Sequence, residues 1–156
     1  PPGAGLVVRR QVWQESVPKR LSLIGRVNGS QLAGEDFEAL LYMHRSGWEI
    51  WYNPAMHIRH QIPKKRLEKA YLIPLIRGSG LCICHLRMIN TKIHQKPIII
   101  IKIILGNLRR AILHLIKYRR QVKTDLVLAC EMEFFLSGLV SPFFFLKKSM
   151  QDKLFA

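Results

Sequence analysis

Large aliphatic side chains recur at alternating steps of three and four residues near the middle of the chain, which is the spacing of one face of an α-helix. The series consists of Ile98, Ile101, Leu105, Leu108, Ile112 and Leu115. Basic side chains occupy other positions of the same stretch: Lys102, Arg109, Arg110, Lys117 and Arg120. The pattern predicts a long, basic amphipathic helix over residues 98 to 120.

Positive charge is concentrated around this helix. The 156 residues carry 25 Lys and Arg against 10 Asp and Glu, and residues 64 to 124 hold fifteen of these basic residues with a single acid. An anionic leaflet attracts such a segment, because each nearby Lys or Arg contributes about 1 kcal/mol and aliphatic side chains enter the headgroup boundary. We therefore expect the five basic residues of the helix to bind the cytoplasmic face of the inner (plasma) membrane peripherally.

A basic chain could instead bind nucleic acid. Helices that do so usually place aromatic or amide side chains among their basic residues, whereas here the basic residues accompany an unbroken aliphatic stripe. We expect no nucleic-acid partner. A basic helical module without catalysis, which binds a membrane or nucleic acid, is the alternative to an enzyme.

Neither apolar segment of the C-terminal half is expected to cross a bilayer. Lys102 and the pair Arg109-Arg110 interrupt the first, and Glu131, Glu133 and Pro142 interrupt residues 126 to 146. A charged side chain at bilayer depth costs at least ~2.5 kcal/mol. The second segment is predicted to be an interfacial or docked helix.

Two of the few acids, Glu35 and Asp36, stand side by side at a predicted helix start. Helical spacing over residues 35 to 46 and Gly47 in a left-handed cap position indicate the helix. The acids either stabilise its first turn, by about 0.3–1 kcal/mol each, or one of them performs proton chemistry. Alternating side chains at residues 48–52 and 56–62 predict two short strands or extended pieces.

The order of motifs resembles the acceptor-side half of inverting family 2 glycosyltransferases, which have the GT-A fold. The resemblance covers residues 1 to about 63, continues loosely to residue 80, and is greatest to bacterial exopolysaccharide enzymes, including the hormogonium polysaccharide type. Its elements are Gly3-Ala4-Gly5, Arg9-Arg10, Gly34-Glu35-Asp36-Phe37-Glu38, Gly47-Trp48-Glu49-Ile50-Trp51-Tyr52-Asn53-Pro54 and His60.

This resemblance implies a helix-rich α/β fragment. Residues 1–80 would be the C-terminal, acceptor-side part of a Rossmann-like GT-A domain without its nucleotide-binding half. Residues 81–156 would be basic and apolar amphipathic helices associated with the membrane. The implied reaction is transfer of a sugar, with inversion, from a nucleotide sugar to a polysaccharide or lipid-linked glycan acceptor.

The resemblance also implies roles for individual residues. Asp36 matches the catalytic base, and His60 matches a histidine that helps to hold Mg or Mn in the full-length parent, although it could equally be a buried core histidine. The implied acceptor-binding residues are Gly3, Ala4, Gly5, Glu35, Trp48 and Trp51.

One departure from the family is important. The chain has no D-x-D motif for the metal-bound donor, since its aspartates are Asp36, Asp125 and Asp152. The spacing of Cys82, Cys84 and Cys130 does not predict a zinc site either. We therefore expect the chain to be a piece of a glycosyltransferase that is inactive by itself.

Overall fold

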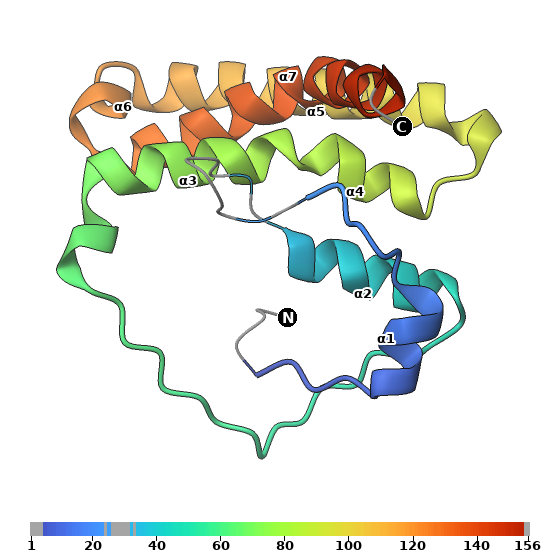
Figure 1. Cartoon of the computed structure of the whole chain (residues 1–156). Helices are drawn as coiled ribbons and strands as arrows, with labels where there is room; N and C mark the ends of the chain where they lie inside the picture. Colours follow the sequence, from blue (N-terminus) through green and yellow to red (C-terminus); the bar gives the residue numbers. More distant parts are fainter. Residues whose placement is uncertain (1–4, 24, 26–31, 33, 155–156) are drawn as a thin grey trace.

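The computed structural model describes residues 5–23, 25, 32 and 34–154, and its regular elements are helices (Figure 1). The three helices that the sequence predicted over residues 35–46, 98–120 and 126–146 are present close to those positions, because helical periodicity is a local property. In chain order the elements are α1 (Arg10–Ser16), α2 (Glu35–Arg45), η1 (Lys64–Leu67), α3 (Lys69–Leu81), α4 (Ile83–Ile89), η2 (Ile93–Gln95), α5 (Lys96–Tyr118), α6 (Gln121–Thr124) and α7 (Leu126–Leu154).

The expected α/β architecture was wrong. No strand occurs in the described part of the chain, so these residues do not form a Rossmann-like sheet, although the expectation of a helix-rich chain is confirmed. The segment after α2 is extended and exposed at residues 48–62, and Figure 1 shows it looping away from the helices. A strand needs a neighbour to pair its backbone N–H and C=O groups, and the described residues provide none for this segment.

Helices α3, α4, α5 and α7 form what we call the helical layer. Both α3 and α5 pack along α7, while α2 packs on α4 and carries α1. In Figure 1 the α3–α4 pair lies between α2 on one side and α5 with α7 on the other. The predicted division at residue 80 falls one residue before the end of α3, and it stays a prediction.

Small residues allow the helices of this layer to approach closely. A Cβ built on Gly80 of α3 would overlap the Ser137 hydroxyl of α7 and would lie 3.0 Å from the Phe134 carbonyl oxygen. A Cβ on Gly138 would meet the amide of Asn107, in α5, at 3.0 Å. Two adjacent residues of α7, Ser137 and Gly138, thus contact two different helices, α3 and α5.

We expect Gly80→Ala to lower the free energy of unfolding by about 1–3 kcal/mol, because backbone as well as side-chain atoms would have to move. Gly106→Ala is the matched control on α5, where a Cβ would meet no heavy atom within 4 Å. It should stabilise the protein by about 0.5–1 kcal/mol through helix propensity. Urea unfolding followed by circular dichroism measures both changes. Equal effects of the two substitutions on the free energy of unfolding would contradict the close approach of α3 to α7 at Gly80.

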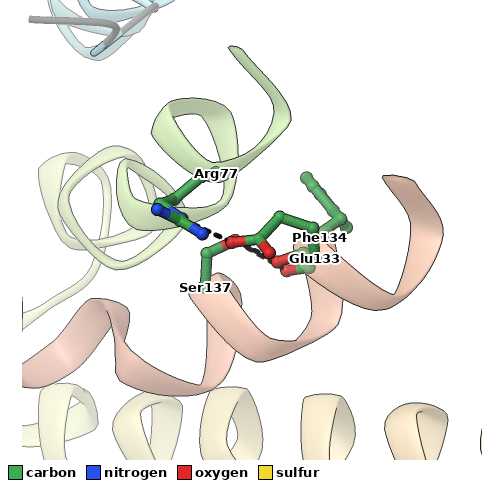
Figure 2. Close-up of polar contacts among 4 residues, drawn as sticks. All are labelled: Arg77, Glu133, Phe134 and Ser137. Carbon is green, nitrogen blue, oxygen red and sulfur yellow. Dashed lines mark hydrogen bonds and ion pairs between the residues drawn. The ribbon is translucent and has the colours of Figure 1, made fainter. Parts of the chain in front are cut away.

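Pro142 and Glu133, two of the residues that were expected to interrupt the segment 126 to 146, each have compensating contacts in α7 or with α3. Pro142 has no N–H to donate to the Gly138 carbonyl, and the Ser141 hydroxyl donates to that oxygen instead, at 2.7 Å. Glu133 forms an ion pair with Arg77 of α3, whose Nε lies 2.6 Å from its Oε1 (Figure 2). The Ser137 hydroxyl donates to the Glu133 carbonyl oxygen at 2.6 Å. These contacts keep one continuous helix through a proline and an acid.

The face of the long helix α5 that packs in the helical layer is not the aliphatic face that the sequence predicted. Its buried residues are Ile103, Asn107, Ala111 and His114. His114 reaches α7, where its Nε2–H donates to the Leu128 carbonyl oxygen at 3.0 Å. The aliphatic series from Ile98 to Leu115 does not supply this packing seam, since its six side chains are 41–59% exposed. The predicted amphipathic helix is present, but its apolar face is open.

Candidate functional site

The first turn of α2 contains three carboxylates, Glu35, Asp36 and Glu38, and Gly34 is the residue directly before the helix. Gly34 precedes the helix with φ 126°, a backbone conformation that favours glycine. Negative charge is favourable at this helix end because the first N–H groups of a helix have no partner within it and the helix dipole is positive there. The surroundings of the three acids nevertheless differ, and they assign each a different role.

Glu38 is the buried acid of the group, with no exposed surface. Its Oε1 accepts the N–H of Ser22 at 3.0 Å, and its Oε2 accepts the N–H of Leu23 at 2.7 Å. His85 of α4 places Nε2 2.8 Å from Oε1, and because an ionised carboxylate only accepts, this nitrogen donates. Glu38 therefore ties the chain before α2 to both α2 and α4.

Opposing effects act on the pKa of Glu38. Burial raises it, while the hydrogen bonds from His85 and from the backbone N–H groups of Leu23 and Ser22 lower it, and the result lies below the ordinary value of 4.5. Glu38 is thus held as a carboxylate by its partners. It is a structural ion and not a group that exchanges protons near neutral pH.

Glu35 turns back towards the chain that precedes the helix. Its Oε2 accepts the N–H of Gly34 at 3.0 Å. A Cβ on Gly25 would lie 2.8 Å from its Oε1, so the carboxylate rests directly against that glycine, which has φ 71°. This contact gives Glu35 a capping role at the start of α2.

Asp36 differs from both neighbours. Its side chain is half-buried, and within the described part of the chain its carboxylate has no hydrogen-bond or ion-pair partner. A half-buried carboxylate with free oxygens can accept a proton from a hydroxyl group brought against it. Of the three acids, Asp36 is the one that the structure leaves available for chemistry.

An apolar pocket of about 480 Å³ lies beside α2. The helix contributes one side of it and the returning extended segment the other: Phe37, Leu40, Leu41, His44, Glu49, Ile50 and Trp51. Trp51 thus lies at a pocket, whereas Trp48 and Asp36 are not among the lining residues. The volume falls within the range of about 300–1,000 Å³ that is typical of small-ligand sites.

The other residues suggested for acceptor and metal binding do not line this pocket or lie outside the described residues. Gly3 and Ala4 lie outside the described residues. Gly5, with φ 91°, has the Ile58 side chain where a Cβ would stand and the Met56 Cε at 3.2 Å. His60 is exposed, which excludes the alternative of a core histidine. In the described residues no three His, Cys, Asp or Glu side chains form a group that could hold a metal.

The residues suggested for membrane binding are all at the surface. Lys102, Arg109, Arg110 and Lys117 are exposed on α5, and Arg120 is exposed just beyond its end. Lys117 places its Nζ 4.8 Å from the ring centroid of Tyr118. The structure thus presents the basic residues to solvent next to the open apolar series.

Sequence reasoning missed the role of Glu38. It lies within the quoted motif, but its partner His85 is 47 residues away along the chain, and no local spacing indicates their contact. No protein-family model matches the chain, and no curated protein and no solved structure is detectably similar to it. The resemblance to family 2 glycosyltransferases therefore stays a prediction.

Proposed function

We propose that this chain supplies the acceptor-activating part of an inverting glycosyltransferase, with Asp36 as the catalytic base. One observation carries the proposal: of the three acids at the start of α2, Glu35 and Glu38 accept hydrogen bonds, while the carboxylate of Asp36 has no partner among the described residues. The order of sequence motifs around Asp36 supports the same assignment. The proposal does not depend on a sheet within these residues.

The chemistry requires one proton acceptor at the acceptor hydroxyl. As the hydroxyl oxygen forms a bond to the anomeric carbon of the donor, the bond from that carbon to the diphosphate breaks on the opposite face, and the hydroxyl proton passes to Asp36. Inversion follows from this single displacement. Trp51 is exposed at the pocket beside α2 and offers an aromatic face on which an acceptor sugar can stack.

The donor has to be held elsewhere. The chain lacks a D-x-D motif, and His60 is not joined by two further ligand side chains in the described residues. We therefore assign no step to a metal held by these residues alone. A complete glycosyltransferase that contains this chain would bind the nucleotide sugar, and any divalent metal, through other residues.

Two preparations test the proposal. Membranes that contain a complete enzyme with these 156 residues should transfer radiolabelled sugar from at least one nucleoside-diphosphate sugar to a glycan, whereas the purified chain alone should transfer none. Transfer by the isolated chain would contradict the division of labour. Absence of transfer from every donor in the complete enzyme would contradict the transferase function itself.

A further inference from the structure

The helical layer buries small and polar side chains at several of its helix contacts, beside an apolar cluster of Cys84, Met88 and Ile103. Besides Ile103, α5 buries Asn107, Ala111 and His114. On α7, Gly138 meets Asn107 of α5 and Ser137 meets Gly80 of α3, and Ser141 is also buried. Water-soluble proteins mostly bury large aliphatic residues. Small and polar residues at helix contacts are typical of helices packed in lipid, because lipid provides no hydrophobic force between large side chains.

Large apolar residues of the same helices point outward. On α5 the six-residue aliphatic series is joined by Ile116, which is 63% exposed. On α7 the exposed side chains are Val127, Leu136, Val140, Phe143 and Leu146. Exposed apolar side chains that follow one another at helical spacing, as on α5, mark protein or membrane interaction sites, unlike apolar residues scattered singly over a surface.

The basic residues of α5 indicate which kind of surface its exposed apolar side chains would bind. Basic side chains border the open apolar series of α5, and residues 96–118 contain no acid. A face that combines aliphatic residues with Lys and Arg is complementary to a bilayer with anionic headgroups, since the aliphatic groups enter the acyl boundary and the cations remain at the phosphates. A surface that is only apolar would leave these cations without counter-charges, whereas anionic headgroups provide them.

We propose that α5 and α7 lie in the plane of an anionic phospholipid bilayer and insert their exposed apolar side chains into it without crossing it. This inference specifies the face and the mode of membrane attachment, and it does not rest on the transferase function. Lys69–Ile89 and Leu126–Lys147 are long and apolar enough to cross a membrane by length and composition alone.

Contacts with α2 argue against crossing. α4 is bound to Glu38 through His85, and the Ile89 carbonyl oxygen accepts a hydrogen bond from Arg45 Nη1 at 3.2 Å. Moving α3–α4 across a bilayer would carry the charged start of α2 towards the hydrocarbon. On α5, Lys102 and Arg109 lie far from the helix ends. If α5 crossed the membrane, both side chains would be buried in the hydrocarbon. An in-plane position leaves all these charges at the headgroups.

Vesicle flotation with the whole chain tests the attachment. The chain should float with phosphatidylcholine vesicles that contain phosphatidylglycerol, and much less with phosphatidylcholine alone. Replacing Lys102, Arg109 and Arg110 with Gln should weaken partitioning about a hundredfold, because each near-surface cation contributes about fivefold. Unchanged partitioning of this triple variant would overturn the proposed charge complementarity.

A second pair of variants tests the apolar face. Leu105→Ser with Ile112→Ser should weaken flotation about tenfold or more. Val7→Ser with Ile62→Ser is the matched control, because these side chains are also exposed but lie outside the layer, and it should float like the wild type. Circular dichroism checks that both variants remain helical. Equal flotation of the two variants, or tight DNA binding without vesicle binding, would overturn the proposal.

Cysteine labelling distinguishes the in-plane position from a span. Lys123→Cys and Lys147→Cys are introduced singly in a Cys130→Ser background, in which the remaining Cys82 and Cys84 are buried. Lys123 precedes the candidate span of α7 and Lys147 is its last residue; the 22 residues of the span correspond to about 33 Å of helix. When the chain is added to preformed vesicles, a membrane-impermeant maleimide should label both sites from outside. Protection of either site until the vesicles are lysed would show a crossing helix and contradict the proposal.

Discussion

Replacing Asp36 with Asn in a complete glycosyltransferase that contains this chain is expected to lower kcat by about 10²–10⁴-fold, the usual contribution of a positioned general base. Asparagine keeps the size of the side chain but cannot accept the proton of the acceptor hydroxyl. Since Asp36 has no partner in the described residues, the loss should not come from unfolding. Initial rates of sugar transfer, measured at saturating donor and acceptor, give kcat directly.

The neighbouring acid provides the control for this experiment. Glu35→Gln removes a carboxylate of the same helix turn, but its amide oxygen can still accept the N–H of Gly34. It should change kcat by less than about tenfold and stability by about 1 kcal/mol at most. If Asp36→Asn retained most of the activity, or if Glu35→Gln abolished it while Asp36→Asn did not, Asp36 would not be the base.

Replacing Glu38 with Leu should destabilise the fold by about 3–5 kcal/mol, the cost typical of removing one partner from a buried ionic contact. Leucine would leave the N–H groups of Ser22 and Leu23 and the His85 ring without their acceptor. Urea unfolding of the purified chain measures the loss. Glu49→Leu, at an exposed acid, is the control and should stay within about 0.5 kcal/mol of the wild type.

The same group should make stability depend on acid pH. The pKa of Glu38 is lower in the folded protein than its ordinary value of 4.5, so the folded state favours the carboxylate more than the unfolded state does. Its contribution is therefore fully present above that ordinary value and is lost as pH falls through the lower, folded pKa. Glu38→Gln should flatten this acid limb of the stability curve. If the loss of stability at acid pH were the same in Glu38→Gln as in the wild type, other carboxylates would be responsible for it.

The start and end of α2 illustrate what can be predicted from local sequence. Helical spacing and first-turn acids predicted a helix over residues 35 to 46, and α2 spans Glu35–Arg45. Gly47 adopts φ 92°, as its predicted left-handed cap requires. These features depend on residues within a few positions of each other, so neighbouring residues suffice to specify them.

Residues 48–62 illustrate the opposite case. Their alternation is that of a strand, but the described residues leave this segment extended and exposed. A helix completes its hydrogen bonds within its own segment, whereas a strand completes them only with another segment. Alternation therefore indicates that a segment can pair, and only the tertiary structure decides whether it does.

The sequence alone indicated where α2, α5 and α7 run, where the positive charge is concentrated and which acids meet at the start of α2, because these are properties of spacing and composition. Only the tertiary structure decided which face of α5 packs on α7 and which of the three carboxylates has no partner in the described part of the chain. Both outcomes depend on contacts between distant segments, such as Glu38 with His85. Such contacts are selected by the shape and polarity of the whole packed chain, and no local pattern encodes them.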